Sequence, residues 1–171
     1  FFYPNQDALA FSDNHFGSAL PYLLLRWLEF TREEAFSGWY VIGCSLNFVV
    51  SYIVLRKLHF SIFAASAGAF VFSYFLPSLA QDGHSQLVYR FAIPLAFYAL
   101  WNFIYKQKIT ALGVLAFWIC VQFYCSIYLG LFLIFLLLAS FIASLPLLKN
   151  NFLGRLAQSW FKSNKLSRIS W

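Results

Sequence analysis

Two short polar clusters hold most of the side chains in this sequence that are able to do chemistry. One is residues 12–15 (SDNH), and the other is residues 81–86 (QDGHSQ), which lead to Arg90. Each cluster has an aspartate two residues before a histidine. The two pairs are Asp13 with His15 and Asp82 with His84. Because the rest of the chain is largely apolar, these clusters are the first candidates for a site.

General base catalysis is the first of three interpretations. A carboxylate beside an apolar wall holds a proton more strongly than one in water, so it can take a proton from a hydroxyl acceptor. Asp13 is the better candidate because Phe11 and Phe16 flank its cluster. Arg90, at the mouth of a predicted span, is expected to hold a lipid phosphate by paired hydrogen bonds. The full expected set is catalytic Asp13, His15 and His84 with substrate-binding Arg90, Asp82 and Gln86.

Two other interpretations use the same residues. Two carboxylates and two imidazoles suit a divalent metal such as zinc or manganese, with Asp13, His15, Asp82 and His84 as ligands. No other cofactor has a motif, since the sequence has no phosphate-binding loop, nucleotide-binding glycine pattern or metalloprotease motif. The simplest interpretation is that both clusters are polar loops in water. The residues alone leave all three open.

The elements that position these clusters are expected to be membrane helices. The chain has 171 residues, of which 61% are hydrophobic and 11% charged, against roughly 25% charged in soluble domains. Its apolar runs are about as long as the ~20 residues that cross a bilayer. The predicted fold class is therefore all-α, a polytopic bundle of transmembrane helices. Five spans are expected, at about residues 39–55, 60–80 and 91–105, and two within 109–148 that separate near residues 126–130.

The segments flanking the bundle complete the predicted domain organisation. Residues 1–38 form an outer loop with an interfacial amphipathic helix at about 17–36, residues 39–148 form the bundle, and residues 149–171 form a basic amphipathic tail. An earlier span is expected before residue 1. Within the spans, Asn47, Asn102 and Gln122 are expected to hydrogen-bond between helices. Trp39 is expected to anchor the chain at the lipid interface.

Charge gives the predicted bundle an orientation. With residues 1–38 outside, nine basic residues fall on the inner side and three on the outer side, as the positive-inside rule expects. The inner set is Arg56, Lys57, Lys106, Lys108, Lys149, Arg155, Lys162, Lys165 and Arg168, and the outer set is Arg26, Arg32 and Arg90. Both polar clusters then lie outside and the tail is cytoplasmic. Because the basic residues follow one membrane face, the net charge of +6 indicates a membrane surface and not nucleic acid.

A resemblance to a known family adds to this interpretation. The motifs that carry it are LAFSDNHFGSALPY at residues 9–22, LNF at 46–48, FVFS at 70–73, LAQDGHSQL at 79–87 and RFAIPL at 90–95. Their order resembles that of bacterial integral membrane glycosyltransferases of the GT-C superfamily, over roughly residues 7–128. The resemblance implies an inner-membrane enzyme that takes a sugar from a polyprenyl-phosphate donor on the outer face. It also implies that Asp13 is the acid of the first outer loop and that His84 and Arg90 lie near the donor phosphate or acceptor.

The alternative function is that of a non-catalytic membrane subunit packed in a larger assembly, which the 22 phenylalanines would suit. The expected partners are membrane lipids, the polyprenyl-phosphate sugar and, for the alternative, neighbouring membrane subunits. The two functions differ in one spatial expectation. In the enzyme, Asp13 and His84 face a single outer cavity, whereas in a subunit that cavity is filled by side chains or by a neighbour.

Overall fold

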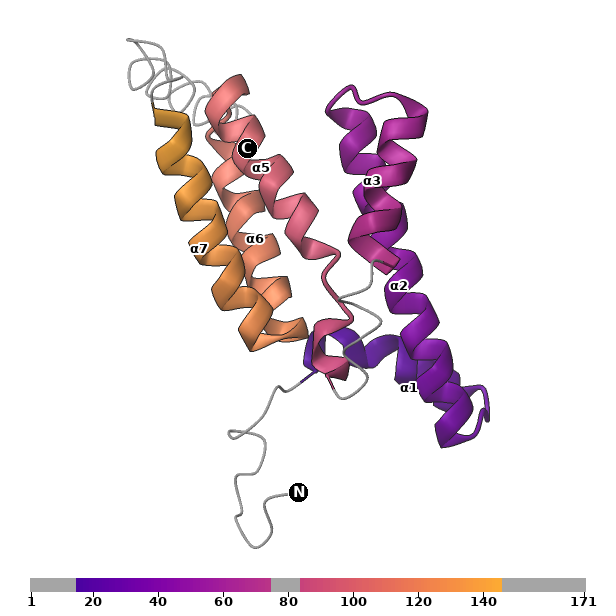
Figure 1. Cartoon of the computed structure of the whole chain (residues 1–171). Helices are drawn as coiled ribbons and strands as arrows, with labels where there is room; N and C mark the ends of the chain where they lie inside the picture. Colours follow the sequence, from indigo (N-terminus) through magenta and orange to yellow (C-terminus); the bar gives the residue numbers. More distant parts are fainter. Residues whose placement is uncertain (1–14, 75–83, 146–171) are drawn as a thin grey trace, which may run out of the picture.

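All regular structure in the described part of the chain is helical. The computed structural model describes residues 15–74 and 84–145, and no strand occurs in them (Figure 1). The six α-helices are α1 (Ala19–Trp27), α2 (Arg32–Lys57), α3 (Ile62–Tyr74), α5 (Ala92–Lys106), α6 (Thr110–Cys125) and α7 (Ile127–Ser144). Two short 3-10 helices, η2 (Phe16–Ser18) and η3 (Ser85–Leu87), precede α1 and α5. The all-α prediction is confirmed for these residues.

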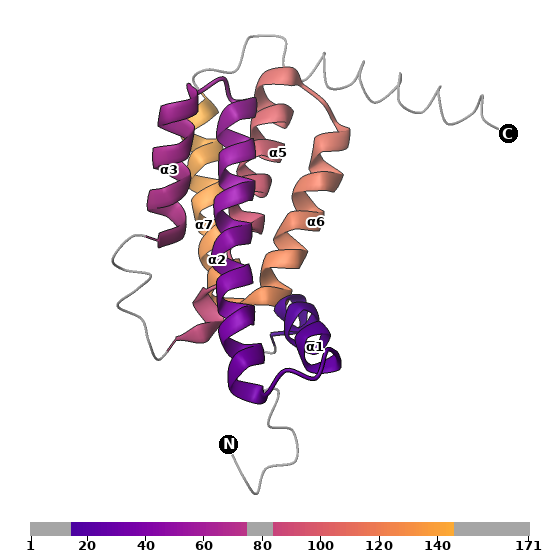
Figure 2. The ribbon, with the colours of Figure 1, turned by 90° about the vertical axis from the view of Figure 1, so that its right-hand side faces the viewer.

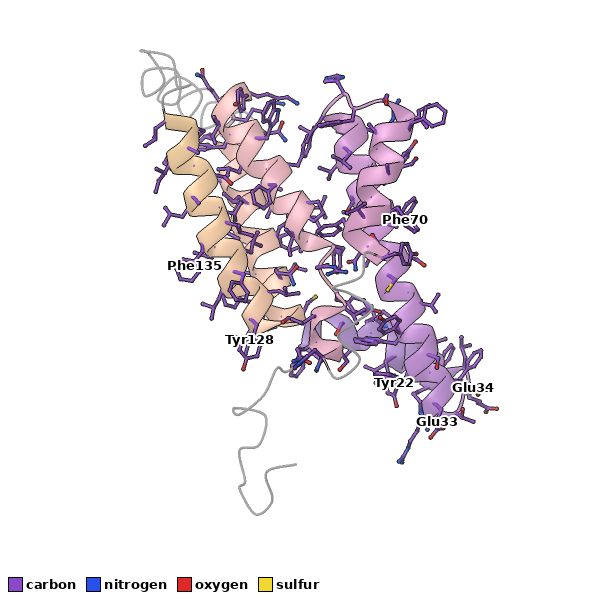
Figure 3. The ribbon with its side chains drawn as sticks, viewed as in Figure 1. Tyr22, Glu33, Glu34, Phe70, Tyr128 and Phe135 are labelled. Carbon is purple, nitrogen blue, oxygen red and sulfur yellow. The ribbon has the colours of Figure 1, made fainter. Side chains whose placement is uncertain are left out.

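Three stretches of the described residues are long and apolar enough to cross a membrane. They are Arg32–Lys57, Ser85–Lys106 and Ile127–Ser144, with mean hydropathies of 1.6, 1.4 and 2.5 in their most apolar windows. The second stretch includes η3 and the non-helical residues before α5. Large apolar side chains point outward along the helices, among them Phe70 and Phe135, which are 59% and 66% exposed (Figure 3). Such a surface suits contact with lipid far better than contact with water.

The start of α2 differs from the expectation of one amphipathic helix over residues 17–36. Helix α1 ends at Trp27, and Glu29 takes a left-handed conformation with φ 66°. A capping box then begins α2: the Thr31 hydroxyl accepts the Glu34 N–H at 3.3 Å, and the Glu34 carboxylate accepts the Thr31 N–H at 2.9 Å. Because these bonds satisfy the free amides of a helix start, the single-helix prediction is wrong. The residues just after Thr31 belong to α2.

The predicted break in the long apolar run after residue 109 is confirmed at Ser126. This residue is extended, with φ −162° and ψ 123°, and its Oγ accepts the N–H of Leu129 at 3.4 Å. It ends α6 and caps α7 at once. Gly130 allows the two helices to pack closely, because a Cβ there would lie 2.7 Å from the ring of Phe123. The Ser126 cap and the absence of a side chain at Gly130 together explain how the chain reverses direction at Ser126 and how α7 then packs on α6.

The helices form two groups that meet at one end. Helices α2 and α3 pack against each other, as do α5, α6 and α7, and α2 also contacts α5. In Figure 1 the lower end of α5 lies near α2 and α3, and the two groups separate toward the upper end. Helix α1, η3 and the turn at Ser126 lie at the lower end, whereas the α2–α3 and α5–α6 turns lie at the upper end (Figures 1 and 2). We call these the α1 end and the basic end.

The two ends differ in charge. The described carboxylates are Glu29, Glu33 and Glu34, all near the start of α2 at the α1 end; Figure 3 labels the last two. Four basic side chains belong to the opposite end: Arg56, Lys57, Lys106 and Lys108. Because successive long helices run in opposite directions, these carboxylates and these basic side chains lie at opposite ends of the molecule, as the sequence predicts for the described residues.

Candidate functional site

A non-helical segment lies inside the bundle, between η3 and α5, and two amide side chains satisfy its backbone. Asn47 of α2 donates from Nδ2 to the Val88 carbonyl at 2.7 Å and accepts the Arg90 N–H at Oδ1 at 3.1 Å. Gln122 of α6 donates to the Tyr89 carbonyl at 3.0 Å. Backbone groups cannot be left unbonded in an apolar interior. Asn47 and Gln122 therefore hold residues 88–90, and the expectation of helix-to-helix bonds from them is corrected.

Trp39 joins the two loops at the α1 end. Its indole Nε1 donates to the Ser18 carbonyl at 2.6 Å, and its own carbonyl accepts the Tyr89 hydroxyl at 2.8 Å. The Trp39 and Tyr89 rings lie 4.8 Å apart between centroids. Trp39 is only 5% exposed, so the expectation that it anchors the chain at the lipid interface is wrong. It connects the first loop, α2 and the segment before α5.

The first loop is fixed on the turn between α6 and α7. A Cβ at Gly17 would lie 2.7 Å from the Cys125 Sγ, 2.9 Å from its backbone nitrogen and 3.0 Å from the Tyr124 carbonyl carbon. The loop backbone therefore approaches the end of α6 as closely as a glycine allows. The Ser18 hydroxyl donates to the His15 carbonyl at 3.2 Å and closes the turn. This contact determines where His15 lies.

The two predicted loops meet in one cavity at the α1 end. The cavity has a volume of about 290 Å³ and is lined by His15, Ser18, Ala19, Tyr22, Phe36, Trp39 and Ser85. His15 has a left-handed backbone (φ 50°), and its ring meets Trp39 edge-on with centroids 6.2 Å apart. His15 comes from the first polar cluster and Ser85 from the second. We call this the His15 cavity.

Of the described members of the second cluster, His84 and Gln86 do not line this cavity. His84 is exposed, and its Nδ1 lies 3.2 Å from the Gln86 Nε2. The Ser85 side chain, which the sequence did not single out, is the one that reaches the cavity. Trp39 and Tyr89 were also missed as organising residues. The mid-helix amides Asn47 and Gln122 were the available signal, because buried amides require polar partners.

Arg90 lies within the bundle at the end of α3. Its Nη2 donates to the Ser73 carbonyl at 3.4 Å, and its Cζ lies 5.4 Å from the centroid of the Phe72 ring. It does not line the His15 cavity. Both contacts are with the last described turn of α3. This position therefore suits Arg90 to hold the end of α3 against the start of α5.

The two aspartates of the predicted site, Asp13 and Asp82, lie outside the described residues. Within residues 15–74 and 84–145, no group of three or more His, Cys, Asp or Glu side chains is placed to hold a metal ion. The general-base and metal interpretations therefore remain predictions. The described part of the site offers imidazole and hydroxyl groups beside a wall of aromatic rings.

No protein-family model, curated protein or solved structure matches the chain. The fold itself defines the class: the described residues are all-α, with three helical stretches that are long and apolar enough to cross a membrane. Three such stretches are compatible with a membrane protein. The GT-C resemblance rests on the sequence motifs.

Proposed function

We propose that this chain is part of a GT-C-like membrane glycosyltransferase, which transfers a sugar from a polyprenyl-phosphate donor at the outer membrane face. The observation that carries the proposal is the His15 cavity. It brings His15 and Ser85, from two polar clusters far apart in sequence, to the same space. An enzyme of this kind needs such a meeting of its outer loops.

The lining of the His15 cavity suits a sugar ring. Tyr22, Phe36 and Trp39 supply flat apolar surfaces, and His15 and Ser85 supply polar groups. A sugar has apolar C–H faces and a rim of hydroxyl groups, so it matches aromatic faces with a few polar contacts. The volume of about 290 Å³ lies at the small end of the ~300–1,000 Å³ range of ligand pockets.

The proposed membrane arrangement has all five long helices crossing, with the α1 end outside. The basic end then faces the cytoplasm, in line with the positive-inside rule. Helix α1 lies in the outer interface: it has no buried residue, and Leu20, Leu23 and Trp27 are 64%, 59% and 79% exposed. A short helix with such an apolar surface suits the boundary between headgroups and acyl chains.

In the proposed reaction the acceptor oxygen bonds to the anomeric carbon of the sugar as the bond from that carbon to the donor phosphate breaks. The phosphate leaves with the bonding electron pair, and Asp13 takes the acceptor proton. Asp13 is two residues before His15 in the sequence, which favours a role at the His15 cavity. Arg90 does not line the His15 cavity and bonds the Ser73 carbonyl, so this scheme gives it no contact with the donor phosphate. A metal is not required in this scheme, and Asp13, His15, Asp82 and His84 are the residues that would hold one.

The test is lipid-linked sugar transfer by the full-length protein in membranes. Asp13→Asn is expected to lower transfer by about 100-fold or more, since a positioned general base contributes ~10²–10⁴-fold. Asp7→Asn, which removes a carboxylate from the same part of the chain, is the matched control and should retain transfer. Full transfer by the Asp13 variant would remove this residue from the mechanism.

The second candidate is the non-catalytic membrane subunit, and the bonding of Trp39 and Arg90 favours it. Both side chains form bonds that hold helices and loops together. In that case the wild-type protein transfers no sugar, and an Asp13→Asn variant still co-purifies with the same membrane partner as the wild type. Transfer by the wild type would exclude this candidate.

A further inference from the structure

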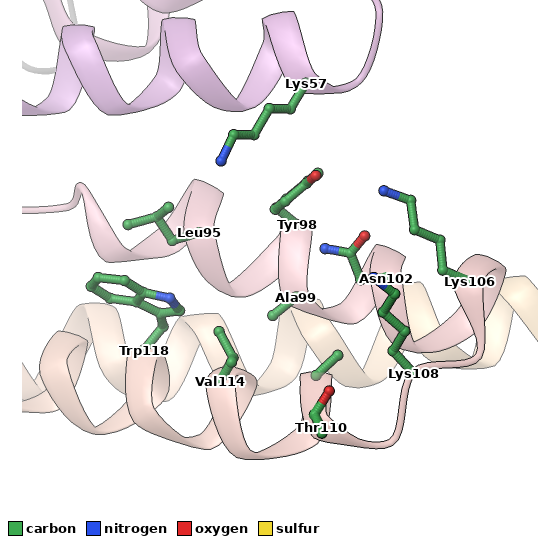
Figure 4. A pocket seen from close by; sticks show the side chains of 11 residues that line it. Lys57, Leu95, Tyr98, Ala99, Asn102, Lys106, Lys108, Thr110, Val114 and Trp118 are labelled. Atoms are coloured by element: carbon green, nitrogen blue, oxygen red, sulfur yellow. The ribbon is translucent and has the colours of Figure 1, made fainter. Parts of the chain in front are cut away.

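A second cavity lies at the basic end, opposite the His15 cavity. It has a volume of about 370 Å³ and is built from the last residue of α2, the inner face of α5, the α5–α6 turn and the first turns of α6. Figure 4 shows its lining side chains. The polar ones are Lys57, Tyr98, Asn102, Lys106, Lys108 and Thr110. We call it the lysine pocket.

Three lysines from different elements surround this pocket. Lys57 is the last residue of α2, Lys106 is the last residue of α5, and Lys108 lies in the turn before α6. The Lys57 and Lys106 ammonium groups each lie 5.6 Å from the centroid of the Tyr98 ring. Tyr98 thus holds cations that arrive from two separate helices. Aromatic faces attract ammonium groups in this distance range.

The lysine pocket has positive charge without a carboxylate to balance it. The described carboxylates, Glu29, Glu33 and Glu34, all lie at the α1 end. Like charges gathered at one site repel each other, so a bound anion would stabilise the arrangement. Helix α6 begins at Thr110, which lines the pocket, and the positive end of the helix dipole adds to the positive potential.

The part of the lysine pocket that α5 and α6 line changes from charged to apolar along these helices. Figure 4 shows the Lys106 and Lys108 side chains at one side and Leu95 and Trp118 at the other, about two to three helical turns deeper along α5 and α6. The Lys57 ammonium, from α2, lies on the Leu95 side of Tyr98, across that ring from Lys106. Asn102 and Thr110 lie near the charged side. A free phosphate would use only the charged part. A molecule with a phosphate and a hydrocarbon portion would use both.

We propose that the lysine pocket binds the phosphate headgroup of an anionic phospholipid. Lys106 and Lys108 contact the phosphate, and Lys57 adds positive charge from across Tyr98. Asn102 and Thr110 contact the glycerol and ester oxygens, and the apolar floor receives the first carbons of an acyl chain. The pocket lies where the candidate spans end, which is the depth of the lipid headgroups. Basic pockets between helices at this level bind anionic lipid. The inference does not depend on sugar transfer at the other end.

The test uses the full-length protein in detergent with equal amounts of phosphatidylglycerol and phosphatidylcholine. Native mass spectrometry measures how much of each lipid stays bound. The wild type is expected to retain phosphatidylglycerol at least about fivefold over phosphatidylcholine, the preference that one basic residue near a membrane surface supplies. The Lys57→Gln/Lys106→Gln variant is expected to lose most of this preference.

Two control variants separate the pocket from general charge and from folding. Arg56→Gln removes the neighbouring charge, which does not line the pocket, and should keep the preference. Lys57→Arg/Lys106→Arg keeps both charges and should also keep it. Equal retention of the two lipids by the wild type would overturn the proposal, as would full preference in the glutamine variant. Displacement of phosphatidylglycerol by millimolar inorganic phosphate would overturn it in favour of a free-phosphate site.

Discussion

At the scale of single residues, a few side chains at the α1 end perform several structural tasks at once. Trp39 bonds Ser18 in the first loop and Tyr89 before α5, and its ring contacts His15. A buried indole N–H or carbonyl left without its partner costs about 1–3 kcal/mol. The position of the His15 cavity therefore depends on the bonds that Trp39 makes in its wall, and on Tyr89, which does not line it.

Alanine substitutions at two glycines of the chain are expected to change the stability of the protein in opposite directions. Gly17→Ala is expected to destabilise the protein by about 1–3 kcal/mol, because the new Cβ would meet Cys125 and Tyr124 closer than contact distance. In contrast, Gly113 lies inside α6 and a Cβ there meets nothing within 4 Å. Gly113→Ala is expected to stabilise the protein by ~0.5–1 kcal/mol through helix propensity. Unfolding in detergent, followed by circular dichroism, measures both.

The difference in stability between the Gly17→Ala and Gly113→Ala variants tests whether the first loop rests on the α6–α7 turn. Equal effects of both substitutions would show that the first loop does not rest on the α6–α7 turn. If Gly17→Ala also abolishes the contact between loop and turn, sugar transfer should fall with it, since His15 is two residues away from Gly17. Gly113→Ala should leave transfer as in the wild type.

At the scale of elements, the chain departs from a simple bundle at residues 88–90. These residues cross between helices without a helical bonding pattern, and Asn47 and Gln122 provide the missing partners. Asn47 makes two of these bonds and Gln122 one. The element that leads into α5 is therefore held from α2 on one side and from α6 on the other.

Hydrogen exchange is expected to detect this support directly. Asn47→Leu leaves the Arg90 N–H without its acceptor and should increase exchange at that amide by about 10-fold or more, since an unmet buried group costs about 1–3 kcal/mol. Gln122→Leu removes only the partner of the Tyr89 carbonyl, so it should increase exchange at the Arg90 amide less than Asn47→Leu does. Asn102→Leu, outside this contact, is the control. Unchanged protection in the Asn47 variant would contradict the assigned role.

The sequence predicts some of these elements better than others, for physical reasons. The apolar runs, the charges at their ends and the break at Ser126 are local signals, and they correctly predicted where α5, α6 and α7 lie and where α2 ends. The capping box at Thr31 is also a local signal. The prediction of one helix over residues 17–36 depends instead on the apolar periodicity that runs across Thr31. The role of residues 88–90 and the burial of Trp39 depend on partners about 20 to 50 residues away, which a helical period does not encode. Asp13 and Asp82 lie outside the described residues, so that part of the site stays a prediction.

At the scale of the whole molecule, the helices are unequal in length. Helix α6 has 16 residues, which is about 24 Å at ~1.5 Å per residue. A bilayer core is about 30 Å thick. If α6 crosses, the bilayer is thinned locally or charged side chains extend from the helix ends to the headgroups. Lys106 and Lys108, next to the start of α6, are long enough for the second solution.

The last prediction concerns the two faces of the molecule. The stretch Ser85–Lys106 is a candidate span, so His84 and Lys108 should lie on opposite sides of the membrane, and both are exposed. In a background with Cys44, Cys120 and Cys125 replaced by alanine, His84→Cys should react with a membrane-impermeant maleimide added to intact cells. Lys108→Cys should react only after the membrane is permeabilised, because the basic end faces the cytoplasm under the positive-inside rule. Reaction of both variants in intact cells would mean that this stretch does not span. The reverse pattern would place the lysine pocket outside and remove the outer-face glycosyltransferase proposal. The phospholipid proposal would still hold, because it requires only that the lysine pocket lies at the depth of the lipid headgroups.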